Sequence, residues 1–383
     1  MKRILTLVLV VIGLTAVSQP YNNEWIRFPQ TYYKFKIVKP GLYRIPKATL
    51  DAAGIGGASV QNFELWRNGK QVPIYTPTSS GPLASNGYIE FWGEGNDGFP
   101  DQILYRNPAY QHTQASSLMT DTAVYFLSIN TTGTGFSYYD AGNDVASNSL
   151  PAEPYFINKA ATYFRNRINP GFAAVVGEYV YSASYDKGEL WSSNYIRPGT
   201  PLDIAMSGLN VYSGGPDATL KFGTMGDALN ARHLKVSVNG SQLVDVVMDF
   251  FSDVNSSVPV PLSLITSGNA SVRFDNASTV GADRMVASYF ELTYPKPFSF
   301  DNQPNYKFSL PASGNKYLEI TNFNYGSVAP VLMNLTTGER ITGDISVPGM
   351  VRFVIAGGGA RDFVLVSQDP ANVNIIEALV PKT

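Results

Sequence analysis

The sequence predicts an all-β protein built from several β-sandwich domains of jelly-roll or immunoglobulin-like type. Apolar and polar residues alternate in several short segments, and Tyr33, Phe35 and Ile37 are expected to share one face of a strand. Asn239 and Gly240 separate two further alternating segments, and this dipeptide tolerates the positive φ angles of a tight hairpin turn. Gly (34), Pro (25), Tyr (23) and Phe (21) are abundant, which is typical of extracellular β-proteins with many turns.

Strand signals run through the whole chain, whereas helical character is brief. After the first strand, Pro40 and Gly41 turn the chain, and residues 47–53 form the one expected helix, which Gly54 ends. The remaining strands are expected at 234–238, 243–247, 286–294, 317–320, 351–355 and 363–366.

Two boundaries divide the chain into three β-domains. Residues 141–154 are polar and rich in Ser, Asn and Pro, which predicts a linker or long loop. Residues 294–297 contain two prolines, which cannot continue a strand ladder. We therefore expect an N-terminal β-domain at 19–150, a β-sandwich domain at 151–297 and a C-terminal β-domain at 298–383.

The first 18 residues have the pattern of a secretory signal peptide. Lys2 and Arg3 precede an apolar run, and a small-residue cleavage site ends at Ser18. The apolar run is shorter than the roughly 20 residues that span a bilayer as a helix. We expect export and a mature chain that starts near Gln19 and has no transmembrane helix.

Composition excludes several function classes. The chain has no cysteine, so it has no thiolate nucleophile, no disulfide and no lipid-modified cysteine. Its formal net charge of −2 argues against a nucleic-acid partner, because phosphates call for a basic surface.

The loop at 94–101 contains oxygen donors between glycines. Glu94, Asn96, Asp97 and Asp101 are the ingredients of a calcium site, although their spacing differs from that of an EF-hand. The interpretation that we favour is a turn in which the Asp side chains accept hydrogen bonds from backbone amides. Calcium is the one cofactor that the sequence suggests.

Three tryptophans are candidates for a sugar-binding surface. Trp66, Trp92 and Trp191 offer flat apolar faces with a polar N–H, as carbohydrate platforms do. Most aromatic residues of a β-sandwich belong to the core or to cross-strand pairs, and we favour that interpretation for each of them.

The remaining candidate residues are carboxylates and histidines. Glu178, Asp186 and Glu189 are candidates for paired glycosidase carboxylates. A structural turn with a buried tryptophan is the interpretation that we favour for residues 188–191. His112 and His233 have no second imidazole or thiol at metal-ligand spacing, so both are expected to be solvated.

Several motifs, taken in order, resemble a known family. They lie at 32–36 (YYKFK), 41–46 (GLYRIP), 62–75 (NFELWRNGKQVPIY), 88–101 (YIEFWGEGNDGFPD), 185–191 (YDKGELW) and 283–295 (DRMVASYFELTYP). Together they resemble the amino-terminal, non-catalytic region of the PorU-like type IX secretion sortases of Bacteroidetes, which are gingipain-type cysteine peptidases. The resemblance covers most of the mature chain.

The resemblance implies both a function and a missing part. In the family, a Cys and His pair in a following peptidase domain removes the sorting domain of secreted cargo and attaches the cargo to a surface lipopolysaccharide, beside an outer-membrane β-barrel protein. The expected partners are therefore that barrel and the cargo, and the expected location is the periplasm or the cell surface, associated with the outer membrane. Either this chain precedes an absent peptidase domain, or it is a free-standing relative that keeps the β-domains for docking.

Two alternatives come from other classes. The first is a surface carbohydrate-binding or adhesin protein whose aromatic residues and acidic loop bind glycans with calcium. The second is a carboxylate hydrolase, whose activity would survive thiol reagents.

Overall fold

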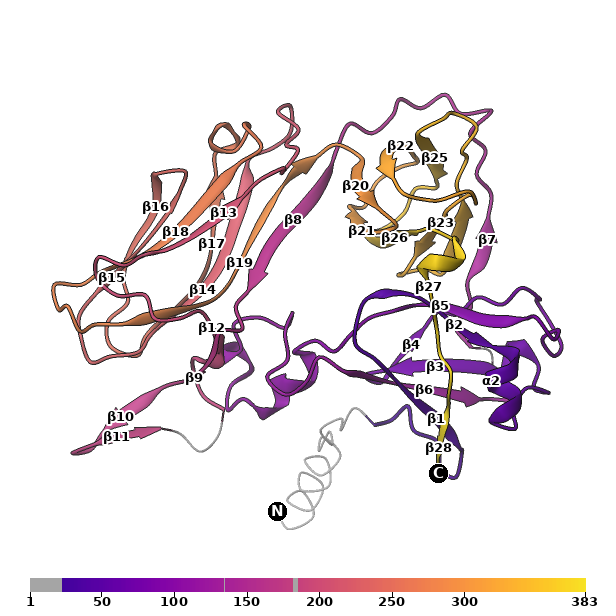
Figure 1. Cartoon of the computed structure of the whole chain (residues 1–383), viewed down its shortest axis with the longest axis horizontal. Coiled ribbons are helices and arrows are strands. Elements are labelled where there is room, and N and C mark those ends of the chain that lie inside the picture. Colours follow the sequence, from indigo (N-terminus) through magenta and orange to yellow (C-terminus); the bar gives the residue numbers. More distant parts are fainter. Residues whose placement is uncertain (1–22, 134, 182–184) are drawn as a thin grey trace, which may run out of the picture.

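The computed structural model describes residues 23–133, 135–181 and 185–383, which form three β-sheet units. In Figure 1 the third unit lies above the first, and the middle unit lies to their left. Each unit has two sheets that face each other around an apolar core. The predicted all-β architecture of several sandwich domains is confirmed. The expected signal peptide at 1–18 lies outside the described residues, among which no helix is long and apolar enough to cross a membrane.

The first unit encloses Phe35, Phe63 and Phe91 between a five-stranded and a three-stranded sheet. In spatial order, the larger sheet consists of β28 (Val380–Lys382), β1 (Tyr32–Ile37), β6 (Ala123–Ile129), β3 (Phe63–Arg67) and β4 (Lys70–Val72). The smaller sheet consists of β27 (Val373–Ile375), β2 (Gly41–Pro46) and β5 (Tyr88–Gly93). The expected helix is α2 (Lys47–Ala52), and Gly54 follows it with a φ of 76°.

The middle unit is a sandwich of two four-stranded antiparallel sheets around Phe222, Phe274 and Phe290. One sheet consists of β13 (Leu202–Met206), β18 (Ala270–Ala277), β15 (His233–Val238) and β16 (Ser241–Val247). The other consists of β17 (Asp253–Val260), β14 (Ala218–Gly226), β19 (Met285–Lys296) and β8 (Phe156–Tyr163). Asn239 and Gly240 join β15 to β16 with φ angles of 47° and 81°, so the predicted hairpin is confirmed.

Two small ribbons extend from one end of the middle unit. β9 (Arg167–Pro170) pairs with β12 (Glu189–Ser192), and β10 (Ala173–Val175) pairs with β11 (Tyr179–Tyr181). The β10–β11 hairpin projects from the body of the molecule (Figure 1). A lone two-stranded hairpin is marginally stable in water, so this projection is a feature that the rest of the fold must support.

The third unit surrounds Phe300, Phe308 and Phe353. Its smaller sheet consists of β20 (Ser299–Gln303), β22 (Lys316–Phe323) and β25 (Met350–Ile355). Its larger sheet consists of β21 (Asn305–Leu310), β26 (Arg361–Val366), β23 (Val331–Asn334), β24 (Glu339–Thr342) and β7 (Tyr139–Ala141). Short 3₁₀ helices occur at Val60–Asn62, Phe99–Leu104, Pro108–Tyr110, Leu262–Leu264 and Pro370–Asn372.

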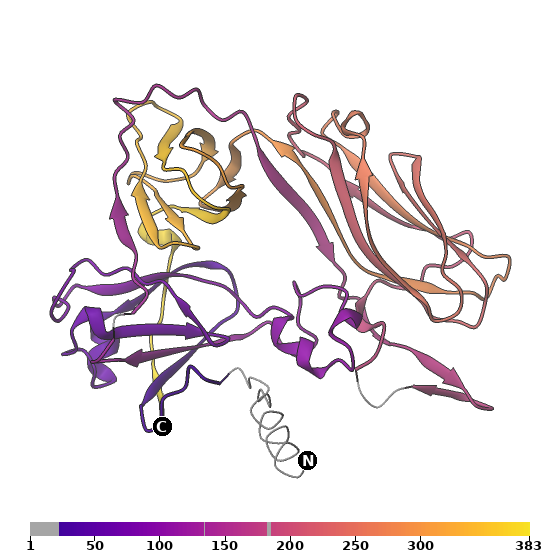
Figure 2. The ribbon, with the colours of Figure 1, turned by 180° about the vertical axis from the view of Figure 1, so that it is seen from behind.

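The chain crosses between units more often than its sequence indicates. β7 joins the third unit by parallel pairing with β24, although it precedes the linker. β27 and β28 return to the first unit, where they pair with β2 and β1 (Figure 2). The division at residues 150 and 297 stays a prediction, and these pairings show that the first and third units exchange strands.

The structure differs from the sequence-based expectation at the linker and at the end of β19. Asn143 donates from Nδ2 to the carbonyls of Thr342 (2.9 Å) and Arg352 (3.0 Å), which holds the linker against the third unit. β19 does not end at Tyr294, because Pro295 and Lys296 still pair with β8. The pairing of β14 with β19 reaches only Thr293, so no β14 residue needs the N–H that Pro295 lacks. The Pro295 carbonyl accepts from the backbone N–H of Tyr212 (2.9 Å).

Candidate functional site

The segment between β5 and β6, residues 94–122, reaches out of the first unit and lies against the end of the middle unit (Figure 1). The Tyr105 hydroxyl donates to the carbonyl of Glu189 (2.6 Å), and the Arg106 N–H donates to the carbonyl of Tyr185 (2.9 Å). This junction contains most of the polar groups that the sequence singled out.

His112 is the centre of the junction, and the prediction that it is solvated is wrong. Its imidazole is buried, with Nδ1 2.9 Å from Ser288 Oγ and Nε2 3.2 Å from Asp253 Oδ2. A Cβ at Gly223 would lie 2.4 Å from Ser288 Oγ and 2.7 Å from His112 Nδ1, so only glycine fits beneath the ring. His233 is exposed, with Nδ1 2.6 Å from Asp245 Oδ1.

The electrostatics of the junction are set by Asp253. Its second oxygen, Oδ1, lies 2.8 Å from Lys187 Nζ. Burial would raise the pKa of Asp253, but the hydrogen bonds from His112 and Lys187 outweigh burial and lower the pKa to about 2. An ionised carboxylate only accepts, so His112 Nε2–H donates to Asp253.

The order Ser288, His112, Asp253 has the connectivity of a hydrolytic triad, but the site cannot take a substrate. Ser288 is buried in β19, and the adjoining cavity of about 30 Å³ has room only for water molecules. The network therefore holds the first and middle units together.

We expect Asp253→Asn to remove the stabilisation of the folded protein that is also lost when acid protonates Asp253. The folded pKa of about 2 lies below the ordinary 3.8, so this stability is complete above pH 3.8 and is lost as the pH falls through 2. A shift of this size corresponds to on the order of 2 kcal/mol. Urea unfolding at about pH 7 and about pH 2.5 measures it. The wild type should lose more free energy of unfolding between these two conditions than the variant, and equal losses would contradict the assignment.

The acidic loop places Glu94 and Asp97 against cations of the protein. Asp97 accepts from Arg67 Nη2 at 3.0 Å and from the Phe99 N–H at 3.1 Å. Glu94 lies 2.7 Å from Lys307 Nζ. Burial would raise the pKa of Glu94, but this lysine and its hydrogen bond hold the pKa below its usual range.

The other two calcium candidates have separate backbone partners. Asn96 donates from Nδ2 to the carbonyl of Thr120 (2.9 Å), and Asp101 accepts from the N–H of Leu118 (2.8 Å). Within the described ranges, no three or more His, Cys, Asp or Glu side chains are grouped so that they could hold a metal. The loop is thus a hydrogen-bonded turn, and calcium binding stays a prediction.

The three candidate tryptophans do not share a surface. Trp66 stacks on Trp25 with ring centroids 5.5 Å apart, and Arg165 lies over the Trp191 ring at 5.3 Å. Trp92 is buried and donates from Nε1 to Glu94 at 3.2 Å. Because Trp92 is buried and the other two rings are partly covered, the structure provides no common platform for a sugar.

The candidate carboxylates Glu178, Asp186 and Glu189 have different structural surroundings. Asp186 and Glu189 lie in one turn, where Asp186 is buried and pairs with Arg106 (3.3 Å). Burial raises the pKa of Glu189, against a backbone hydrogen bond at Asp186 that lowers it. Glu178 lies in the turn of the β10–β11 hairpin.

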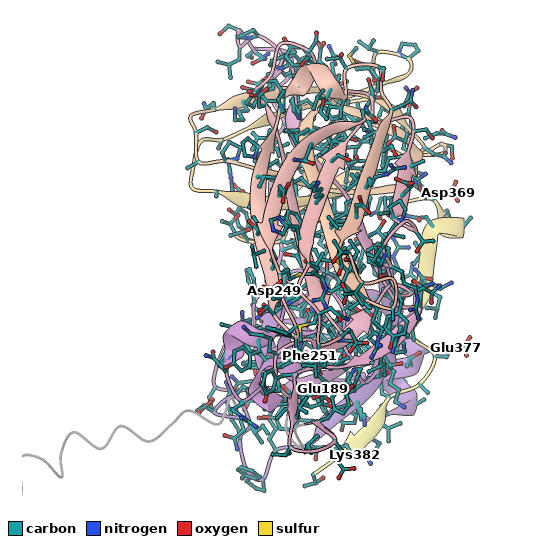
Figure 3. All side chains as sticks on the ribbon, turned by 90° about the vertical axis from the view of Figure 1, so that its left-hand side faces the viewer. Glu189, Asp249, Phe251, Asp369, Glu377 and Lys382 are labelled. Carbon is teal, nitrogen blue, oxygen red and sulfur yellow. The ribbon has the colours of Figure 1, made fainter. Side chains whose placement is uncertain are left out.

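Sequence reasoning missed a groove of about 550 Å³ beside the junction. Phe172, Val175, Leu229 and Phe250 supply apolar walls, and Lys187 lies at its polar side. Figure 3 views this end of the molecule, with Phe251 and Asp249 labelled. The groove is formed by loops that are far apart in the sequence, so no single motif marks it.

A buried ion pair fixes the loops that line the groove. Arg232 and Asp283 have fully buried side chains, and two nitrogens of the guanidinium donate to the carboxylate at 2.6 and 2.7 Å. The remaining guanidinium hydrogen bonds reach the carbonyls of Ala228 (2.9 Å), Met248 (2.8 Å) and Phe250 (2.6 Å). One cation therefore positions the loops that carry Leu229 and Phe250.

Comparison with solved structures relates the fold to one protein over nearly the whole chain. No protein-family model matches this chain, and no curated protein sequence does. Dimeric latent PorU from Porphyromonas gingivalis matches with a TM-score of 0.56 and 15% identity, over 92% of this chain and 33% of that chain. The predicted PorU-like fold is thus confirmed, and this chain spans about a third of the length of that protein.

Two carbohydrate-active proteins match far less well. Carbohydrate-binding module CBM36, solved with calcium and xylotriose, has a TM-score of 0.22 and 8% identity over 35% of this chain and 98% of that chain. The β-porphyranase BpGH86A from Bacteroides plebeius has a TM-score of 0.22 and 12% identity over 71% of this chain and 36% of that chain. Likenesses of this size carry no argument about function.

Proposed function

We propose that this chain is the exported, non-catalytic β-domain region of a type IX secretion sortase-like protein. In this role it positions a peptidase and docks to outer-membrane secretion components and cargo. The observation that carries the proposal is the similarity of fold to latent PorU over 92% of the chain, a length that includes all three units. The motifs at 62–75, 88–101 and 283–295 support the same relationship independently.

The chain itself has no cysteine and therefore no cysteine nucleophile. A cysteine peptidase activity would belong to a further domain or to a partner, and the β-units would hold that domain at the outer membrane. The expected location is accordingly the periplasm or the cell surface.

The connections between the units suit a positioning role. The His112 network joins the first unit to the middle unit, and strands β7, β27 and β28 cross between the first and third units. Units that are tied in this way transmit a fixed orientation, which a peptidase needs in order to meet its substrate.

The first test is the intact mass of the native polypeptide, recovered from its source cells with an antibody against this region. A polypeptide far heavier than 41.7 kDa, with peptidase activity that a thiol reagent blocks, would support the proposal in its peptidase form. A polypeptide near 41.7 kDa that co-purifies with an outer-membrane β-barrel protein would support the free-standing form. Recovery near that mass with neither a peptidase nor a barrel protein would overturn the proposal.

A further inference from the structure

Residues 373–383, which we call the closing segment, run from the third unit to the first unit and complete both of its sheets (Figure 1). Strand β27 pairs in parallel with β2, and β28 pairs antiparallel with β1. Asn372, directly before the segment, exchanges amide hydrogen bonds of 2.8 and 2.9 Å with Asn305 of β21. The closing segment is therefore a pair of donated strands that the third unit holds at one end.

The first unit provides a specific site for the middle of the segment. Ile376 is buried in the core of the first unit, and Leu379 packs against the same core. The Ile376 N–H donates to the carbonyl of Arg44 (2.9 Å), and the Ile376 carbonyl accepts from Thr49 Oγ1 (3.1 Å). The site therefore takes an extended chain with an aliphatic side chain at the position of Ile376.

Asn374 fixes the register of the segment in this site. Its Nδ2 donates to the carbonyl of Leu42 (3.1 Å). A Cβ at Gly41 would lie 2.8 Å from the same Nδ2 atom, so glycine leaves the room that the Asn374 side chain occupies. The site thus recognises a particular sequence as well as an extended backbone.

The outer part of the closing segment is held more loosely. All three residues of β28 are exposed, and one of them, Pro381, has no N–H to donate to a ladder. Ile375 and Val380 are each 50% exposed, and a groove of about 490 Å³ lies between β1 and the segment. In Figure 3 the segment runs along the outside of the molecule past Glu377 and Lys382. Segments with few buried apolar contacts open at a low free energy compared with the core.

We propose that two copies of this chain exchange their closing segments, so that each first unit binds β27 and β28 of the other copy. A second copy fits the site because it carries the same residues, and the hydrogen bonds and core contacts are then the same as within one chain. Protein concentration decides between the two arrangements, since only the exchanged one joins two chains. The inference does not depend on the proposed function.

The geometry of the chain permits this exchange. A segment that is released after Asn372 reaches roughly 35 Å when extended, which spans the distance to the first unit of an adjoining copy. Strand β7 and the contact of Glu90 with Arg340 do not involve the segment, so each third unit stays on its own first unit. The exchange therefore leaves the rest of the fold in place.

Paired cysteines test the exchange cleanly, because the chain has none of its own. Lys34 of β1 lies opposite Val380 of β28, and side chains directly opposite each other in a sheet are close enough for a disulfide. Full-length Lys34→Cys and Val380→Cys are purified separately, mixed at high concentration and oxidised. A disulfide between positions 34 and 380 can then join only two different copies. We expect this disulfide, identified by mass spectrometry, to increase with protein concentration.

Two controls separate exchange from random contact. Lys34→Cys mixed with Val328→Cys measures random collision, because Val328 lies in the third unit and is 46% exposed, much like Val380. The 34–380 disulfide should exceed this background several-fold. The double variant Lys34→Cys, Val380→Cys, oxidised in dilute solution, should close within one chain and then form no dimer when concentrated. A yield equal to the background, a double variant that does not close, or a closed variant that still dimerises would each overturn the inference.

A further variant tests whether the segment must leave its site before it is exchanged. Thr49→Val removes the hydrogen bond to the Ile376 carbonyl and should speed formation of the 34–380 disulfide about fivefold, the effect of one ordinary hydrogen bond. The final yield should stay the same, because the bond is lost in both arrangements. An unchanged rate in a variant that urea unfolding shows to be folded would contradict exchange through release of Ile376.

Discussion

Replacing Arg232 with methionine is expected to lower the free energy of unfolding by about 3–5 kcal/mol. The change leaves the Asp283 carboxylate fully buried without its cation and frees the carbonyls of Ala228, Met248 and Phe250. Burial would raise the pKa of Asp283, but hydrogen bonds, first from Arg232, hold it below its usual range. The variant should therefore also lose the defined shape of the loops around residues 229 and 250.

Urea unfolding of the whole protein at neutral pH measures this loss. The control is Arg273→Met, which breaks an exposed pair with Asp203 that has bonds of 2.6 and 2.8 Å. Because solvent screens an exposed pair, the control should cost far less than the loss of the buried pair. If both variants unfolded at the same urea concentration, the buried pair would not be the support of these loops.

Sequence patterns revealed the parts of the fold that depend on neighbours along the chain. The strand at Tyr32–Ile37, the turn at Asn239 and Gly240 and the helix end at Gly54 are specified by alternation or by a positive φ within a few residues. The all-β class follows from the repetition of such signals. Local physics was sufficient there because each element is formed by residues close in sequence.

The junction could not be predicted, because its partners are distant in sequence. His112 lies 176 residues from Ser288 and 141 residues from Asp253, so a polar local context made it look solvated. One signal was available in β14, where Gly223 lies inside the strand and Gly226 ends it. Glycine at such positions often marks the close approach of another group, which here is His112 over Gly223 and Arg232 over Gly226.

The exchange of strands between the first and third units could not be predicted from the sequence either. β27 and β28 have three residues each, too few to show a period, and their partners β2 and β1 lie at the other end of the chain. The burial of Trp92 could not be predicted for the same reason. Burial of Trp92 depends on packing against Val331 and Val364 of the third unit.

The second large effect is expected at Glu90, where Glu90→Ala should lower the free energy of unfolding by about 3–5 kcal/mol. Its carboxylate is fully buried, 2.8 Å from Arg44 Nη2 of the first unit and 3.9 Å from Arg340 Nη2 of the third unit. Arg44 also donates to Gln368 Oε1 (2.9 Å). Without the carboxylate, two largely buried guanidiniums would remain at this interface without the charge that they share.

Loss of Glu90 should also loosen the first unit from the third, which urea unfolding and limited proteolysis can resolve. New cleavage is expected in the linker at 141–154, because Asn143 holds this segment only while the third unit keeps its place. Glu90→Gln keeps the shape and removes the charge, so its effect should be smaller than that of alanine. Wild-type stability together with an unchanged cleavage pattern in Glu90→Ala would show that β7, β27 and β28 alone join the units. In that case strand exchange, and not the buried carboxylate, would fix their orientation.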